Sequence, residues 1–205
     1  PNCSTIQAMV PLKALLDNYG IKRIVYSTYQ AVSGAGMQGI KDLEDGLKGL
    51  APKKFPYQIA GNCLPHIDVF LENGYTKEEM KMIEETRKIL HSDDLKITAT
   101  TVRVPVLNSH SESINVELNS PFELEDIFKL FEKTEGLTVF DNLNELKYPT
   151  ALDVSGKDDV YVGRIRRDFS LDNGLNLWVV ADNIRKGAAL NAVQIAEVLI
   201  KNEWL

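Results

Sequence analysis

The sequence has little of what marks membrane and secreted proteins. Its 205 residues contain no apolar run that approaches the roughly 18 residues of a membrane-spanning helix. The N-terminal stretch does not have the charged and then apolar pattern of a signal peptide. The two cysteines, Cys3 and Cys63, are too few for a disulfide framework. We therefore expect a cytoplasmic protein with no membrane partner.

Other absences narrow the classes of ligand. The sequence has three histidines and no CxxC or HxxxH pair, so we expect no metal site. A net charge of −6 provides no basic footprint for nucleic acid. The spacing Gly-x-Gly-x-x-Gly occurs once, at Gly34, Gly36 and Gly39, but such a lone short match is weak evidence, and we expect no dinucleotide-binding domain within these residues. The composition that remains, 44% apolar and 25% charged, is typical of a globular chain with a sizeable core.

Hydrophobic periodicity and end signals predict the secondary structure. Helices are expected from Cys3 to a stop at Gly20 and over 38–49, 75–90, 120–133 and 184–201; strands are expected over 21–29, 97–106, 114–118, 137–140, 160–165 and 175–181. Cap signals mark three helix starts, namely the pairs Thr76 with Glu79 and Ser120 with Glu123, and the single residue Asp182. Strands occur in pairs more often than in strict alternation with helices. This pattern favours an α+β fold, with a mixed, largely antiparallel sheet and helices on one face.

Cys3 lies at the start of the first predicted helix. The partial positive charge and free N–H groups of a helix N-terminus stabilise a thiolate, and they also bind an oxyanion that forms on a substrate. Cys3 is therefore a candidate nucleophile. The alternative is a small buried side chain that happens to begin a helix.

A nucleophilic cysteine needs a base, and the candidates are His66, His91 and His110. His91 follows the end of a capped helix and is expected to be a solvated C-cap, while His66 is expected near the core. His110 lies among small polar residues in a predicted turn between two strands, where an imidazole is both reachable and held. Each of the three also suits a purely structural role.

Two charged features suit either a structural or a functional role. Arg103 interrupts a strand of small and apolar residues, and its planar guanidinium suits a carboxylate, either in an ion pair or as a substrate clamp. Glu78 and Lys81 share one helix face, where the simplest interpretation is a surface ion pair of little energetic value. The Gly-rich loop 30–39 follows the end of a strand, which is where α/β proteins usually bind ligands.

Long stretches of the chain resemble one enzyme family, aspartate-β-semialdehyde dehydrogenase. The stretches are PNCST, STYQAVSGAG, PHIDVFLENGYTKEEMKM, VRVPVLNSHSESINVE, VGRIRRD and WVVADNIRKGAALNAVQIAE, which occur in the family's order between Pro1 and Glu197. The resemblance implies NADPH-dependent reductive dephosphorylation of L-aspartyl 4-phosphate to L-aspartate 4-semialdehyde and phosphate. This reaction belongs to the biosynthesis of lysine, threonine and methionine.

The same resemblance assigns roles to individual residues. It implies that Cys3 is the nucleophile that forms a thioester, that His110 is the acid/base, and that Gln30 orients the substrate. It also implies that Arg103 binds the α-carboxylate of the substrate and that Glu78 binds its α-ammonium.

The remaining roles that the resemblance implies concern phosphate and cofactor. Lys81 and Asn2 match phosphate-binding positions, so the pair of Glu78 and Lys81 becomes two ends of one ligand site. Asn183 matches a contact to the nicotinamide of NADP, with Ser33 and Gly34 in the loop beside it.

The chain departs from the family at two points. Gly61 and Cys63 replace larger apolar residues, so Cys63 is expected to be a core substitution without a redox role. Members of the family also carry an N-terminal Rossmann domain that binds the phosphates of NADP, and we expect no such domain within these residues. We therefore expect a catalytic and dimerisation domain at 1–182 and a closing helix at 183–205 that in the family packs on the nucleotide domain. These residues alone are expected to have little or no dehydrogenase activity.

The fold that the resemblance implies is similar to the catalytic domain of glyceraldehyde-3-phosphate dehydrogenase, with one sheet face serving a homodimer or a higher even oligomer. Three other functions stay open. One is an N-acetyl-γ-glutamyl-phosphate reductase, although the Glu78 carboxylate suits a free ammonium better than an acetylated nitrogen. The others are a non-catalytic dimerisation module and a hydrolase that uses the same cysteine and histidine without NADPH.

Overall fold

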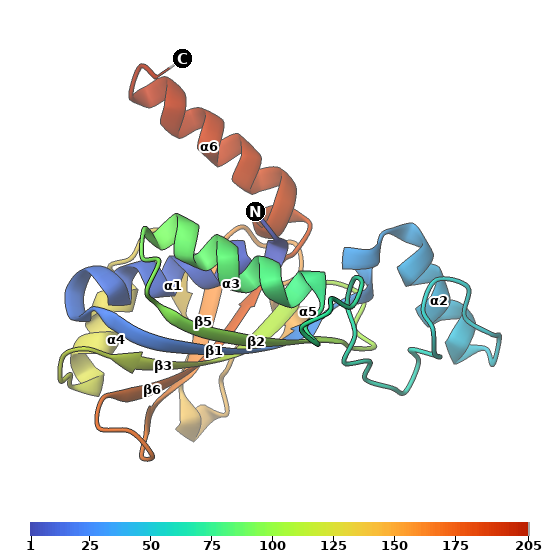
Figure 1. The fold of residues 1–205 in the computed structure, drawn as a ribbon, viewed down its shortest axis with the longest axis horizontal. Coiled ribbons are helices and arrows are strands. Elements are labelled where there is room, and N and C mark those ends of the chain that lie inside the picture. Colours follow the sequence, from blue (N-terminus) through green and yellow to red (C-terminus); the bar gives the residue numbers. More distant parts are fainter. Residues whose placement is uncertain (205) are drawn as a thin grey trace.

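Six strands form one sheet in the order β2-β1-β3-β6-β5-β4 (Figure 1). The computed structural model describes residues 1–204. The strands are β1 (Ile21–Gln30), β2 (Lys96–Arg103), β3 (His110–Leu118), β4 (Leu137–Val139), β5 (Val160–Asp168) and β6 (Gly174–Ala181). β1 and β2 are parallel, as are β4 and β5, and the other neighbours are antiparallel. The predicted mixed, largely antiparallel sheet is confirmed.

The helices lie mainly on one face of this sheet. They are α1 (Cys3–Tyr19), α2 (Met37–Leu47), α3 (Lys77–Leu90), α4 (Leu124–Glu132), α5 (Ala151–Val154) and α6 (Leu190–Lys201), with short turns η1 (Val32–Ala35), η2 (Leu143–Glu145) and η3 (Arg185–Ala189). α1 contacts β1, β3 and β6, and α3 lies beside it on β2 (Figure 1). The core between these helices and the sheet is apolar and includes the fully buried Leu12, Leu15 and Ile114. Burial of this apolar surface stabilises the packing of the helices on the sheet, and the strand ends therefore have fixed positions.

A smaller lobe lies beside the sheet and contains α2 (Figure 1). Its own core consists of Val32, Leu43, Ile59, Ala60 and Leu64. The Asp42 carboxylate accepts hydrogen bonds from the backbone N–H groups of Lys53, Lys54 and Phe55, which ties the following loop to α2. Residues 50–65 form no helix and take part in the sheet only through an isolated bridge at Leu64.

The chain ends on a helix that extends away from the body (Figure 1). The Asp182 carboxylate accepts from the backbone N–H groups of Ile184 and Arg185 at 2.9 and 3.0 Å, so the predicted cap is confirmed. A π-helical turn, η3, separates this cap from α6. None of the α6 side chains is buried by residues 1–204. Within that same range, no helix combines the length and the apolar character needed to cross a bilayer.

The second predicted capping box is wrong. α4 begins at Leu124, and Glu123 is its N-cap residue without a side-chain cap hydrogen bond. The Glu123 carboxylate instead lies 3.5 Å from the guanidinium of Arg167 on β5. A tertiary contact has therefore replaced the local one that the Ser120 and Glu123 spacing predicts.

Two further predictions about local structure are wrong. β3 begins at His110 rather than at Ile114, because the backbone from His110 onward pairs with β6. Cys63 is exposed and not part of a core, because it follows a turn at Gly61, where φ is +74°. The division of the chain at residue 182 stays a prediction.

Candidate active site

Polar side chains from several elements meet at one end of the sheet. Gln30 and Arg103 are the last residues of β1 and β2 and are paired in register. His110 is the first residue of the antiparallel β3, so it lies at the same end. Cys3 begins α1 close by, because Gln7, one turn further along, donates to the His110 carbonyl at 3.3 Å. The structure therefore brings the predicted nucleophile, base and clamp together.

Cys3 begins α1 next to its cap, Asn2. The Asn2 side-chain oxygen accepts from the backbone N–H of Ser4 at 2.8 Å, which fixes the first turn. Burial, followed by the charge of Glu78, raises the pKa of the Cys3 thiol to about 11, although the Ser4 N–H acts in the opposite direction. The expectation that the helix N-terminus alone favours the thiolate is wrong here, because desolvation outweighs it. Cys3 therefore needs a proton acceptor or a bound substrate to become a nucleophile.

His110 is fully buried, so the prediction of a reachable imidazole in a turn is wrong. Its Nδ1 accepts a hydrogen bond from the backbone N–H of Ala31 at 3.0 Å, which assigns the proton of the neutral ring to Nε2. Nε2 has no hydrogen-bond partner within residues 1–204. Burial, together with the nearby charge of Arg103, lowers the pKa of His110 to about 3. The ring is therefore neutral at physiological pH and presents an N–H donor.

Arg103 is buried beside this imidazole. Its Nη1 donates to the Ala31 carbonyl at 2.7 Å, and its Nε lacks a partner in the described part of the chain. Gly34 packs against both groups, since a Cβ there would lie 2.9 Å from Arg103 Nη1 and 3.2 Å from His110 Nε2. The lack of a side chain at Gly34 lets the Gly-rich loop lie directly against the guanidinium and the imidazole.

Gln30, Glu78 and Lys81 form a connected group. Gln30 Nε2 donates to Glu78 Oε1 at 3.0 Å, and the Lys81 Nζ lies 3.6 Å from Glu78 Oε2. Lys81 is also bound to Asp68 at 3.1 Å. Because α3 places Glu78 against the sheet, its carboxylate is buried. The interpretation of Glu78 and Lys81 as a surface ion pair is therefore wrong.

The predicted cofactor residues form a second network. Asn183 Oδ1 accepts from the backbone N–H of Ser109 at 2.9 Å, and Asn183 Nδ2 donates to Ser33 Oγ at 3.0 Å. Both ends of the Asn183 amide are thus used inside the protein. Asn183 fixes the Gly-rich loop against the start of β3, so the surfaces left for a ligand here belong to Ser33 and Gly34.

The other two histidines have different surroundings. His91 is the exposed C-cap of α3, as predicted, and its backbone is in the left-handed conformation. His66 stacks on Phe70, with 4.4 Å between the ring centroids. Of the three histidines, His110 is the one whose backbone is hydrogen-bonded to α1, through Gln7.

Glu112 is a residue that sequence reasoning missed. It is completely buried, and its charge acts on the Cys3 thiol. Burial raises the pKa of Glu112 well above its usual value. The available signal was its spacing, because a carboxylate two residues after His110 shares the inward face of the strand with Ile114.

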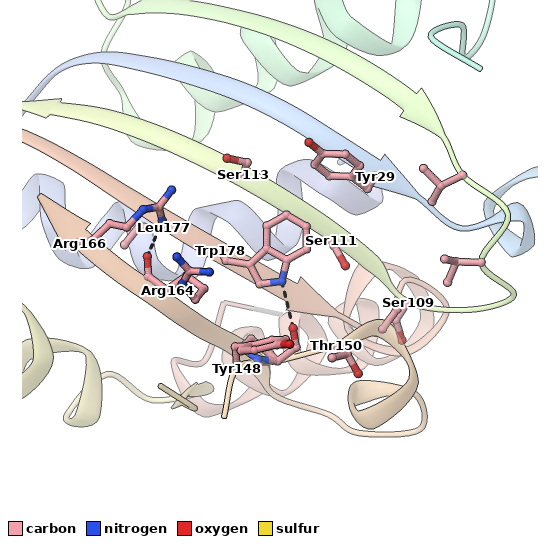
Figure 2. Close-up of a pocket in the computed structure, with 14 residues that line it drawn as sticks. Tyr29, Ser109, Ser111, Ser113, Tyr148, Thr150, Arg164, Arg166, Leu177 and Trp178 are labelled. Atoms are coloured by element: carbon pink, nitrogen blue, oxygen red, sulfur yellow. Dashed lines mark hydrogen bonds between the residues drawn. The ribbon is translucent and has the colours of Figure 1, made fainter. Parts of the chain in front are cut away.

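A cavity of about 620 Å³ lies on the opposite face of the sheet. Figure 2 shows Tyr29 and Trp178 beside it, together with Ser111, Arg164 and other lining residues. The Trp178 indole donates to the Pro149 carbonyl at 3.0 Å. The cavity contains none of the predicted catalytic or substrate-binding side chains, so it is separate from the group around Cys3.

Comparison with known protein families decides the assignment. Residues 12–186 match the family described as semialdehyde dehydrogenase, dimerisation domain. The chain belongs to the semialdehyde dehydrogenase family. Similar proteins carry a more specific name within it. The aspartate-semialdehyde dehydrogenase of Aquifex aeolicus is 54% identical over an alignment of 208 positions, which covers 98% of this chain and 61% of that protein.

Solved structures of semialdehyde dehydrogenases agree with this fold. The crystal structure of aspartate semialdehyde dehydrogenase II from Vibrio cholerae, complexed with ASA, has a TM-score of 0.93 and 49% identity over 98% of this chain and 61% of that one. A structure from Candida albicans with NADP has a TM-score of 0.74 and 28% identity over 100% of this chain and 57% of that one. The predicted family and α+β fold are confirmed. The chain spans less than two thirds of the length of each of these relatives.

Proposed function

We propose that this chain provides the catalytic domain for the reductive dephosphorylation of L-aspartyl 4-phosphate to L-aspartate 4-semialdehyde, with NADPH as reductant. One observation carries the proposal. Two buried side chains of opposite charge, Glu78 and Arg103, both influence the pKa of the Cys3 thiol: Glu78 raises it and Arg103 lowers it. A cation and an anion beside one nucleophile suit a substrate that has an α-carboxylate and an α-ammonium.

Cys3 forms the covalent bond in this proposal. Its thiolate attacks the acyl carbon, a C–S bond forms, and the C–O bond to phosphate breaks, which gives a thioester. Arg103 binds the α-carboxylate and Glu78 the α-ammonium, while Gln30 keeps the Glu78 carboxylate in place through their 3.0 Å hydrogen bond. These contacts orient the acyl group before attack.

Phosphate binding is assigned to Lys81 and Asn2. The Lys81 ammonium lies at the edge of the group around Cys3, between Glu78 and Asp68. The Asn2 side-chain oxygen is committed to the helix cap, so its amide nitrogen is the end available to a phosphate oxygen. Both residues supply donors, as a leaving phosphate requires.

His110 stabilises the oxygen of the acyl group. Its Nε2–H donates to the oxyanion that develops when the carbonyl carbon becomes tetrahedral. Because Ala31 occupies Nδ1, the neutral ring serves as a donor and not as an acceptor at Nε2. The resemblance implies a general acid/base, and in our proposal His110 performs only the donor part of that role.

The loop around Ser33 suits the nicotinamide end of NADP. Gly34 leaves no side chain between the loop and the buried Arg103 and His110, so Ser33 and Gly34 are the residues that would hold the nicotinamide. NADPH, when bound, supplies the hydride that converts the acyl group into an aldehyde. Asn183 acts by holding Ser33 in position.

An N-acetyl-γ-glutamyl-phosphate reductase is the nearest alternative. Buried Glu78 disfavours it, because an acetylated nitrogen has no charge to offset that of a buried carboxylate. Activity of the complete enzyme on aspartate 4-semialdehyde, with NADP and phosphate, tests the choice. Preference for the N-acetylated substrate would contradict our proposal.

Two features of the whole protein belong to the same proposal. We assign a homodimer, or a higher even oligomer, to the sheet face that carries Tyr29 and Trp178, and analytical ultracentrifugation tests this assignment. A cytoplasmic location stays a prediction. Expressed alone, residues 1–205 should show little or no dehydrogenase turnover, and turnover near that of a full-length relative would contradict this expectation.

A further inference from the structure

The Glu79 side chain joins the start of α3 to the edge of the sheet. One carboxylate oxygen, Oε1, accepts from the backbone N–H of Thr101 on β2 at 3.0 Å, and the other, Oε2, accepts from the backbone N–H of Thr76 at 2.8 Å. Both Glu79 and Thr101 are buried. The capping box of α3 accounts for the second of these bonds. The bond to Thr101 leaves the helix and has a different purpose.

The bond to Thr101 fills an open position on an edge strand. β2 is the outermost strand of the sheet and has β1 on its inner side. Because Thr101 and Arg103 are two residues apart, their backbone N–H groups point to the same, outer edge. Arg103 exchanges backbone hydrogen bonds with Leu64 at this edge, at 2.8 and 2.9 Å. Glu79 takes the place of a strand partner at Thr101, so a buried backbone N–H is satisfied by a side chain of α3.

This contact lies next to the two charged groups of the site. Glu78 precedes Glu79 on α3 and accepts from Gln30 of β1 at 3.0 Å. Arg103 lies two residues beyond Thr101 on β2 and is paired in register with Gln30. The helix and the strand are thus joined within two residues of each charged side chain. The position of the Glu78 carboxylate relative to the Arg103 guanidinium therefore depends on how the first turn of α3 is held on β2.

The rest of α3 and of β2 is held by other contacts. α3 lies along β2 (Figure 1). In the second half of the helix, Thr86 hydrogen-bonds to Tyr26 at 3.0 Å and Arg87 donates to the Leu95 carbonyl at 3.1 Å. β2 is paired with β1 along its whole length. Loss of the Glu79 bonds should therefore shift the first turn of α3 and leave the strand in place.

We propose that Glu79 fixes the distance between the Glu78 carboxylate and the Arg103 guanidinium, and thereby determines the selectivity of the site for ligands with a free α-ammonium beside an α-carboxylate. One carbon atom joins the two charged groups of such a ligand, so their partners in the protein need a matching, fixed spacing. Glu79 acts through Glu78 and is a positioning residue. The inference rests on the proposed function, which assigns the ammonium to Glu78 and the carboxylate to Arg103.

Two substitutions separate the position of Glu79 from its charge. Glu79→Gln has one acceptor oxygen instead of two, so one of the two backbone N–H groups faces an amide N–H₂ and loses its partner. Glu79→Asp keeps the negative charge but is one methylene shorter, so its carboxylate cannot reach both N–H groups. A purely electrostatic effect of Glu79 on a bound ammonium would change only in Glu79→Gln, whereas an effect on position should change in both.

The test compares two ligands of the complete enzyme. Aspartate 4-semialdehyde is the substrate, with NADP and phosphate, and succinate semialdehyde is a competitive inhibitor that has the same carboxylate and aldehyde but no amino group. We expect both variants to raise KM for aspartate 4-semialdehyde by about tenfold and to change the inhibition constant of succinate semialdehyde by less than about twofold. In a Glu78→Gln background, neither substitution of Glu79 should raise KM further, because the group that Glu79 positions is already lost.

Thr76→Ala is the matched control. It removes the hydroxyl that accepts from the Glu79 backbone N–H at 3.3 Å and keeps both bonds of the Glu79 carboxylate. Loss of this cap should lower Tm and leave KM and the inhibition constant unchanged. A purely structural role predicts that the Glu79 variants behave in the same way. That result would overturn the proposal, as would a raised KM in Glu79→Gln but not in Glu79→Asp. Should Glu79→Gln not fold, Glu79→Asp decides.

The single variant Glu78→Gln distinguishes failure of this inference from failure of the proposed function. A raised KM in Glu78→Gln, with an unchanged KM in both Glu79 variants, would reject the positioning role alone. An unchanged KM in Glu78→Gln would reject the assignment of the ammonium to Glu78, and the inference with it.

Discussion

Gln30 on β1 and Glu78 on α3 are joined by a hydrogen bond of 3.0 Å between amide nitrogen and carboxylate oxygen. The two residues are far apart in the sequence, yet both are buried at the same end of the sheet. The bond orients a carboxylate that would otherwise be costly to bury. A helix and a strand thereby contribute jointly to one binding group.

Glu78→Gln removes the charge and keeps the shape. In the complete enzyme we expect KM for aspartate 4-semialdehyde to rise by about thirtyfold, equivalent to about 2 kcal/mol, because the α-ammonium loses its buried partner. Steady-state kinetics measure the change. Glu84→Gln, an exposed position on the same helix, is the control. Equal KM values for the variant and the unmodified enzyme would remove Glu78 from the binding site.

Arg103→Lys keeps the charge but loses the planar fork. We expect KM to rise at least about tenfold, since an ammonium cannot both donate to the Ala31 carbonyl and bind a carboxylate with two hydrogen bonds. Arg23→Lys, on the distant half of β1, serves as the control. If a substrate analogue without the α-carboxylate loses as much affinity as the substrate itself, the clamp is not at Arg103.

His110 makes stability depend on pH. Its pKa in the fold is about 3, against an ordinary value of 6.5, so below pH 6.5 the unfolded chain binds a proton that the folded chain does not. Stability is then lost as the pH falls through this window, by about 1.4 kcal/mol per pH unit. Urea unfolding near neutral pH and near pH 5 should show a shallower loss in His110→Gln. His91→Asn, at the exposed end of α3, should match the unmodified protein, and a slope that His110→Gln leaves unchanged would contradict the buried neutral ring.

Gly187 sets the position of the nucleophile. A Cβ at this point of η3 would lie 2.9 Å from the Cys3 Cβ. Gly187→Ala should displace Cys3 and slow its acylation by up to about 10²-fold, because misplacement of a reacting atom is costly. Ala188→Ser, at the exposed neighbour, should have no effect. Unchanged acylation kinetics in Gly187→Ala would show that η3 does not position Cys3.

Patterns that are local in the chain could be predicted from the sequence. The capping box at Thr76 and Glu79 is confirmed, since both of its hydrogen bonds form within one turn. The predictions that proved wrong concern local structure that is determined by contacts between residues far apart in the sequence. Glu123 contacts Arg167 on another element, and strand pairing with β6 draws His110 into β3 and buries it.

The burial of individual charged side chains and the pKa values of buried groups could not be predicted from the sequence. The spacing of Glu78 and Lys81 fits a surface pair as well as a buried one, and only the packing of α3 on the sheet distinguishes them. The raised pKa of Cys3 results from desolvation, which needs the whole fold. The site residues that the resemblance implies were nevertheless brought together around Cys3, and their functional roles stay predictions.

The most direct measurement is acylation of Cys3 in the absence of NADPH. Thioester formation needs no hydride, so residues 1–205 can be tested with L-aspartyl 4-phosphate that is generated in situ from aspartate and ATP by an aspartate kinase. We predict an aspartyl group on the peptide that carries Cys3, detected by mass spectrometry, and none in Cys3→Ser. An unmodified Cys3 peptide in the folded protein, or acylation that persists in Cys3→Ser, would contradict the account.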